Sequence, residues 1–176
     1  GARANFLFKP ALSELQSMGS EIFKECGNCI TRRTAAAKQT QVGERFDAED
    51  VHAGRAAQDE VLEEEDDILA SLTDSIGQML KLYGEPIMPV VETFLPALAP
   101  YASPTHPEAL QIVAISFVDD VIEYGGSAAH KFIPGLLPIL MANAANTETE
   151  LALSQCSAYG LAKTVGCASE LICVSH

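Results

Sequence analysis

Three evenly spaced glycines constrain the fold of this 176-residue chain more than any other feature of its sequence. Gly84, Gly125 and Gly166 are separated by 41 residues each time. Apolar residues recur fifteen, eight and four positions before each glycine: Leu69, Leu110 and Leu151; Ile76, Phe117 and Ala158; Leu80, Val121 and Ala162. These offsets place the apolar residues on one side of a helix. Each segment is therefore predicted to be an amphipathic helix that stops at its glycine, where a left-handed residue satisfies the last carbonyl groups.

A second helix is predicted after each of the first two glycines. The segments around Leu95-Pro96 and Leu137-Pro138 are strongly apolar, and their internal prolines should kink the helices because proline lacks a backbone donor. Helix pairs that recur every 40–47 residues are typical of HEAT or armadillo arrays, in which stacking of neighbouring pairs makes the core. We predict an all-α fold, an armadillo-like α-α superhelix (solenoid) of HEAT repeats that serves to bind other proteins.

The helix boundaries follow from the same pattern. Helices are expected over 11–38, 60–83, 87–99, 107–124, 127–144 and 147–165, with a truncated helix from Ala168. The domain organisation predicted from them is a helix of a preceding repeat with its tail (1–43), an acidic linker running into the next helix (44–59), two HEAT repeats (60–104 and 105–146) and a truncated HEAT repeat (147–176). The start at Gly1-Ala2-Arg3 and the apolar end over 171–176 lead us to expect a fragment of a longer protein.

Acidic residues dominate the charge of the chain, which is −13 overall. This charge repels phosphate backbones and attracts basic proteins, so nucleic-acid binding is not expected. Eleven of the 24 acidic residues lie between Glu44 and Asp67, where only Arg45 and Arg55 oppose them. We interpret part of this stretch as a contact for basic cargo, with a simple solvated charge run as the alternative. The candidate residues there are Glu60, Glu63, Glu64, Glu65, Asp66 and Asp67.

A second group of candidates lies near the predicted end of the helix over 107–124. Asp119, Asp120 and Glu123 stand where the helix dipole disfavours carboxylates, and this mild misfit suggests a use in binding. We include these three residues in the candidate surface for basic cargo.

Catalysis, metal binding and membrane insertion have little support in the sequence. The four histidines lie far apart without a nucleophile or acid at a diagnostic spacing, so no enzyme and no cofactor are expected. Cys26 and Cys29 form a lone C-x-x-C without further ligands, and zinc needs four. Five cysteines without a framework spacing suit a reducing compartment. The longest apolar runs, over 87–102 and 132–145, are too short to span a membrane and contain prolines.

Several short sequences in this helical framework resemble a known family. Ser116-Phe117-Val118-Asp119-Asp120-Val121-Ile122-Glu123-Tyr124 and Cys156-Ser157-Ala158-Tyr159-Gly160-Leu161 are similar to segments of the importin-β (karyopherin-β) superfamily, most of all its importin beta-3 type. The acidic residues before Ile68, the Tyr83-Gly84-Glu85 turn and Leu95-Pro96 occur in the same order there. The resemblance covers about 60–165.

This resemblance implies a central piece of a nuclear transport receptor that shuttles between cytoplasm and nucleus through the nuclear pore. It would carry basic cargo such as ribosomal proteins or histones, bind phenylalanine-glycine nucleoporins and release cargo on binding Ran-GTP. The main Ran site is expected outside this chain. The first helix of each pair would lie on the convex face and the second on the concave cargo face. The alternative is a HEAT scaffold of another class, such as a phosphatase regulatory subunit or a vesicle-coat adaptor.

Overall fold

The computed structural model describes residues 2–42, 48–146 and 151–174, with side chains over 12–38, 59–146 and 151–166. All the regular structure in this part of the chain is helical. In order it comprises α1 (Ala2–Val42), α2 (Ala48–Tyr83), η1 (Glu85–Ile87), α3 (Met88–Leu98), η2 (Ala99–Ala102), α4 (Glu108–Tyr124), η3 (Gly126–Ala129), α5 (Ile133–Ala145) and α6 (Leu151–Val174). The predicted all-α fold is confirmed.

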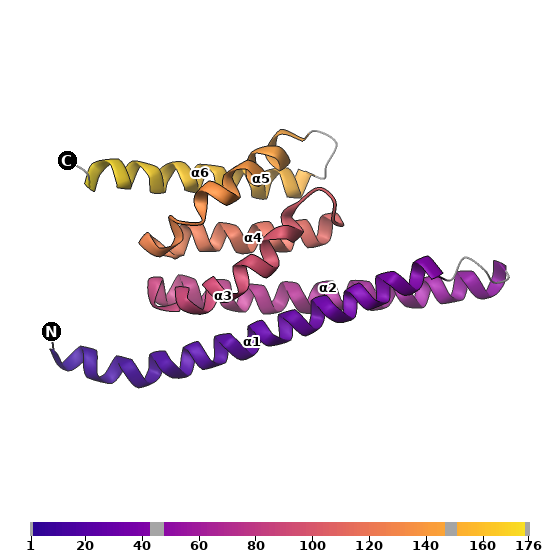
Figure 1. Cartoon of the computed structure of the whole chain (residues 1–176), viewed down its shortest axis with the longest axis horizontal. Coiled ribbons are helices and arrows are strands. Elements are labelled where there is room, and N and C mark those ends of the chain that lie inside the picture. The colour runs from indigo at the N-terminus through magenta and orange to yellow at the C-terminus, as the bar shows by residue number, and fades with distance from the viewer. Residues whose placement is uncertain (1, 43–47, 147–150, 175–176) are drawn as a thin grey trace.

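The helices form two layers (Figure 1). In one layer α1, α2, α4 and α6 lie side by side, and in the other α3 and α5 cross in front of them. Two long helices of the first layer are each followed by a shorter helix of the second: α2 by α3, and α4 by α5. Pro96 and Pro138 lie inside these shorter helices, as the sequence predicted. This is the arrangement of a HEAT-type solenoid.

Polar contacts join each helix pair to the next at a separation of about one repeat. Asn143 Nδ2 on α5 donates a hydrogen bond of 2.8 Å to the carbonyl of Ala102, 41 residues earlier. Ser127 Oγ donates to Glu85 Oε1 at 2.6 Å, across 42 residues. Because residues one period apart bond to each other, successive pairs must stack directly on their neighbours.

An aromatic cluster closes the core between α1, α3 and α4. The rings of Phe23 and Phe94 stack with centroids 4.2 Å apart, and Phe117 meets both rings edge-on at 6.1 and 5.9 Å. All three side chains are buried. The cluster therefore ties three helices from both layers together through the geometry that aromatic pairs prefer.

Glycine ends helices α2 and α4 in different ways. Gly84 follows α2 with φ of 64°, and its N–H donates to the carbonyl of Leu80 at 2.7 Å, so the predicted stop is confirmed. After α4 the positive φ, 59°, belongs to Gly126, whereas Gly125 keeps a helical φ of −75°. Gly125 is instead buried where a Cβ would approach Met88 Sδ to 2.7 Å. Its lack of a side chain allows η1 and η3 to pack closely.

The predicted stop at Gly166 is wrong. Helix α6 continues through this glycine to Val174, so the separate helix expected from Ala168 is the end of α6. A Cβ at Gly166 would meet no other side chain within 4 Å. A helical glycine costs only about 1 kcal/mol relative to alanine, which the packing of α6 against α4 and α5 outweighs.

The buried face of α6 also differs from the one predicted by the 41-residue period. Leu151 is 72% exposed, and Ala158 and Ala162 are exposed as well. The buried residues of this helix are Leu153, Ser157, Gly160 and Thr164, and three of them lie two positions after the predicted ones: Leu153, Gly160 and Thr164. A shift of two residues turns a helix by about 200°, so it selects the opposite face. Helices α2 and α4 bury the residues that the period predicts: Leu69, Ile76 and Leu80 on α2; Leu110, Phe117 and Val121 on α4.

Helix α2 begins at Ala48, twelve residues before the predicted start at Glu60. Residues 48–59 of the expected acidic linker are therefore helical, while residues 44–47 lie outside the described part. Helix α1 is likewise longer than the predicted 11–38. The two long helices pack against each other, and this tertiary contact overrides the weak periodicity of the local sequence.

Candidate functional site

The acidic residues between 60 and 67 divide into two sets on α2. Four of them stand at helical spacing on one exposed side, which we call the acidic face: Glu60, Glu63, Glu64 and Asp67. Within the part of the chain whose side chains are described, none of these four makes an ion pair. Glu65 and Asp66 point elsewhere, toward α1. The acidic face is therefore the part of this run that is open to a partner.

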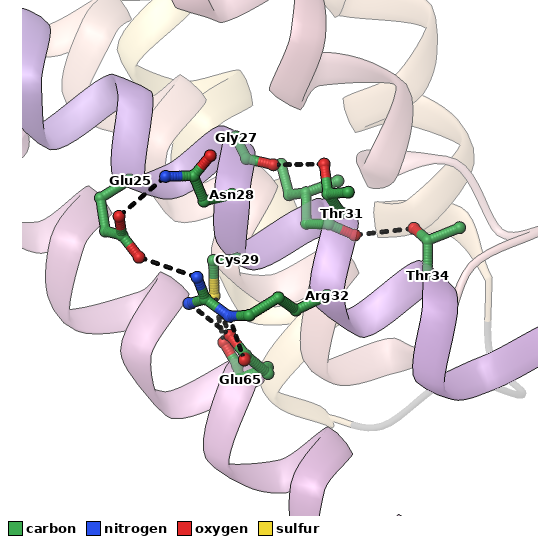
Figure 2. Close-up of polar contacts among 9 residues, drawn as sticks. Glu25, Gly27, Asn28, Cys29, Thr31, Arg32, Thr34 and Glu65 are labelled. Atoms are coloured by element: carbon green, nitrogen blue, oxygen red, sulfur yellow. Dashed lines mark hydrogen bonds and ion pairs between the residues drawn. The ribbon is translucent and has the colours of Figure 1, made fainter.

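Glu65 is held in a polar cluster with α1 (Figure 2). Glu65 as a whole is 8% exposed, and its carboxylate accepts bonds from Arg32 Nε at 2.5 Å and Arg32 Nη2 at 2.9 Å. The thiol of Cys29 also donates to Glu65 Oε2 at 2.9 Å, and Arg32 Nη1 reaches Glu25 at 2.9 Å. The hydrogen bond from Arg32 holds the pKa of Glu65 below its usual value. The cluster holds α1 against α2, and Arg32 neutralises the charge of Glu65.

Asp66 is paired in the same manner with Arg33, and both side chains are largely buried. The sequence interpretation considered only Arg45 and Arg55 as opposing charges and so missed Arg32 and Arg33. One signal was present: two consecutive arginines on one helix match two consecutive acids on the next, 33 residues later in both cases.

Asp119 and Asp120 on α4 lie between two glycines of neighbouring helices. A Cβ at Gly160 of α6 would overlap Asp119 Oδ1, and one at Gly77 of α2 would overlap Asp120 Oδ2. Asp119 is only 5% exposed, and its Oδ1 has no hydrogen-bond partner among the described residues. The two carboxyl groups thus fill space that the glycines of the neighbouring helices leave open.

Burial raises the pKa of both aspartates. The pKa of Asp119 rises to about 8, chiefly through desolvation and also through the charges of Asp120 and Glu123. Desolvation, Asp74 and Glu123 raise the pKa of Asp120 to about 6, against the pull of Lys81. A carboxyl group without a cation beside it keeps its proton when it is removed from water.

Glu123, the third candidate on α4, already has partners within the chain. Lys163 Nζ lies 2.6 Å from Glu123 Oε1, and Tyr159 donates to Oε2 at 2.5 Å. Burial pushes the pKa of Glu123 upward, but the bonds from Lys163 and Tyr159 outweigh it and the pKa is lowered. Glu123 therefore joins α4 to α6 as a charged carboxylate.

A groove of about 440 Å³ opens beside these carboxyl groups where α2, α4 and α6 meet. We call it the aspartate groove. Three of its lining residues are aspartates and the others are polar or aromatic: Asp74, Asp119 and Asp120; Ser116, Gln155, Cys156 and Tyr159. A smaller cavity of about 230 Å³ continues between α2 and α4 and shares Asp74, Ser116 and Asp120.

A second groove, of about 380 Å³, lies in the other layer between α3–η2 and η3–α5. Its lining is mostly apolar and includes Leu95, Pro96, Phe132 and Ile139. Lys131 lies at this groove and pairs with Glu92 at 2.6 Å. The two grooves differ in chemistry, because carboxyl groups contribute to the lining of the first and not of the second.

Cysteine and membrane chemistry add no further site among the described residues. Cys26 and Cys29 are buried thiols, and burial raises the pKa of each to about 12. No group of three or more histidine, cysteine or acidic side chains in the described part is placed to hold a metal ion. Among the described helices none is both long and apolar enough to cross a membrane.

Comparison with known proteins finds a sequence similarity to a relative of one family. Over 129 residues the chain is 27% identical to a probable importin-5 homolog of Dictyostelium discoideum. The similarity points to the importin-β family of nuclear transport receptors. The match covers 73% of this chain but only 12% of the length of that relative. No family model matches the chain.

Proposed function

We propose that this chain is a segment of a nuclear transport receptor that binds basic cargo proteins, such as ribosomal proteins or histones, through the acidic face of α2, which belongs to the layer of first helices and not to the second-helix layer that the resemblance implies for cargo. The similarity to an importin homolog and the two-layered helical array support this assignment. The receptor shuttles between cytoplasm and nucleus, binds phenylalanine-glycine nucleoporins, and releases cargo on binding Ran-GTP, mainly through regions outside this segment. Its action is binding, without catalysis or a cofactor. Residues 60–104, 105–146 and 147–176 are its proposed HEAT repeats.

The observation that carries the cargo assignment is the exposure of four unpaired carboxylates on two turns of α2. Glu60, Glu63, Glu64 and Asp67 share one side of the helix, and no cation of the described residues neutralises them. Carboxylates of one sign gathered on a surface attract basic proteins over roughly a Debye length and raise the rate of association. The net charge of −13 extends the same attraction over the whole chain.

Neutralising part of the acidic face should weaken cargo binding more than the same charge change elsewhere. We expect Glu63→Gln with Glu64→Gln to lower the affinity for a histone about three- to tenfold, because two exposed charge contacts are lost. The matched control is Glu14→Gln with Glu21→Gln, two exposed acids of α1 that change the net charge equally. Fluorescence anisotropy with a labelled histone at low and at physiological salt measures both. Equal losses in the two variants would show that only the net charge matters.

A further inference from the structure

We propose that Ser103, in the turn between η2 and α4, is phosphorylated by a proline-directed serine kinase that uses ATP. Residues 103–107 read Ser-Pro-Thr-His-Pro and connect the end of η2 at Ala102 to the start of α4 at Glu108. Of the nine prolines in the chain, only Pro104 follows a serine or a threonine. A kinase that requires proline directly after its target therefore has a single candidate in this sequence. The proposal is independent of the binding of basic cargo.

The backbone of Ser103 already has an extended shape that a partner can bind. Its φ of −73° and ψ of 144° are the values of polyproline II. The ring of Pro104 favours this shape, because it disfavours a helical conformation of the residue before it. An extended segment can be laid into the groove of a partner protein, whereas a serine inside a helix first requires the helix to unwind.

The hydroxyl of Ser103 is only weakly held. Its Oγ accepts hydrogen bonds from the N–H of Thr105 at 3.5 Å and from the Thr105 hydroxyl at 3.2 Å, and both distances exceed the usual lengths. Ser103 is partly exposed, and Pro104 and Thr105 are exposed. By contrast, Ser71 and Ser157 lie within helices and donate at 2.9 and 2.8 Å to the carbonyl four residues earlier. Ser103 is thus better placed to receive a phosphoryl group.

Two buried amides hold the turn at its ends. Asn143 Nδ2 donates to the carbonyl of Ala102 at 2.8 Å, and Gln111 Nε2 donates to the carbonyl of His106 at 2.6 Å. The side chains that make these bonds belong to residues that are 0% and 3% exposed. Because both bonds lie outside residues 103–105, the tip of the turn can be modified without the loss of a buried contact.

The transfer balances with ATP as the co-reactant. A bond forms between Ser103 Oγ and the γ-phosphorus as the bond from that phosphorus to the bridging oxygen breaks, so ADP leaves. The hydroxyl proton passes to a carboxylate base of the kinase. The phosphate adds a charge of about −1.5 to −2 at the turn. Its oxygens can accept from the N–H and hydroxyl of Thr105, and such charge-assisted bonds are stronger than the two long bonds they replace. Phosphorylation should therefore make the turn more rigid.

The test incubates the folded full-length protein with ATP and a cyclin-dependent kinase and locates phosphate by peptide mapping with mass spectrometry. We expect phosphate on Ser103 of the wild type, and none in the same peptide of Ser103→Ala. Pro104→Ala should lower the initial rate at this site about tenfold or more, because a pocket that fits proline leaves the new N–H unpaired. Thr105→Ala, a change at the neighbouring exposed residue, is the control and should keep the rate within about twofold.

A synthetic peptide over residues 98–110 separates the motif from its presentation by the fold. Phosphorylation of the peptide and not of the folded protein would overturn the proposal, because the turn would then not present Ser103. Equal rates for Pro104→Ala and the wild type, or phosphate on Thr105 in place of Ser103, would also overturn it. Hydrogen exchange at the amide of Thr105 should be slower in the phosphorylated protein. Unchanged exchange there would contradict the new bonds from Thr105 to the phosphate.

Discussion

Replacing Phe117 by alanine should lower the free energy of unfolding by about 3–5 kcal/mol, the usual cost of deleting a buried aromatic ring. Phe117 is buried and meets the rings of both Phe23 and Phe94, so its loss opens a cavity between α1, α3 and α4. Helices from both layers lose a shared contact, and the void cannot be filled without moving one of them. Urea unfolding followed by circular dichroism measures the change.

Phe132→Ala provides the matched control for this prediction. Phe132 is only partly buried, lies at the apolar groove and has Lys131 over its ring at 5.1 Å. The same substitution should therefore cost about 1–2 kcal/mol, since part of the ring is already in water. Equal costs at the two positions would mean that the aromatic cluster is not the centre of the core.

The second large effect is expected at Asp119 and depends on pH. The folded-state pKa of about 8 lies above the ordinary value of 3.8, because burial and two nearby acids disfavour the charged form. The folded chain therefore binds a proton more tightly than the unfolded chain, and stability falls as the pH rises from about 4 to about 8. Asp119→Asn abolishes this loss, because asparagine has no proton to release.

The variant should gain stability over the wild type by up to ~1.4 kcal/mol for each pH unit in this window, and the difference should level off above about pH 8. Thermal unfolding at a series of pH values measures it. Glu14→Gln, which changes an exposed acid of α1, is the control for the loss of one carboxyl group. A difference between Asp119→Asn and wild type that does not vary with pH would mean that Asp119 is solvated and charged at neutral pH.

Sequence periodicity predicted the helix pairs because two consecutive repeats keep the same buried columns. Leu69 and Leu110, Ile76 and Phe117, and Leu80 and Val121 all lie in the core. Helix α6 does not keep this register. Most of its buried residues come two positions later than the period predicts, and the matching Gly166 lies inside the helix. Alanine in two of the three predicted apolar positions of that helix was a sign that the pattern had weakened.

The candidate site was predicted less completely, because a carboxylate's role depends on what the neighbouring helices bring to it. The sequence located the acidic run on α2. It did not reveal that Arg32 and Arg33 on α1 neutralise two of its residues, Glu65 and Asp66. Asp119 and Asp120 pack against Gly160 and Gly77, which leave room for the two carboxyl groups on the flanking helices. These pairings join residues 33 to 43 positions apart, and the sequence carries a sign only of the first, where two consecutive arginines match two consecutive acids 33 residues later.

Retention of the full-length protein on immobilised phenylalanine-glycine repeats tests most directly whether this helical array belongs to a nuclear transport receptor. Serine-glycine repeats of equal length provide the control surface, because they keep the flexibility of the chain and lose the aromatic ring. The account predicts retention on the phenylalanine-glycine surface and none on the control. Equal behaviour on both surfaces would contradict it and would favour a HEAT scaffold of another class, such as a phosphatase regulatory subunit or a vesicle-coat adaptor.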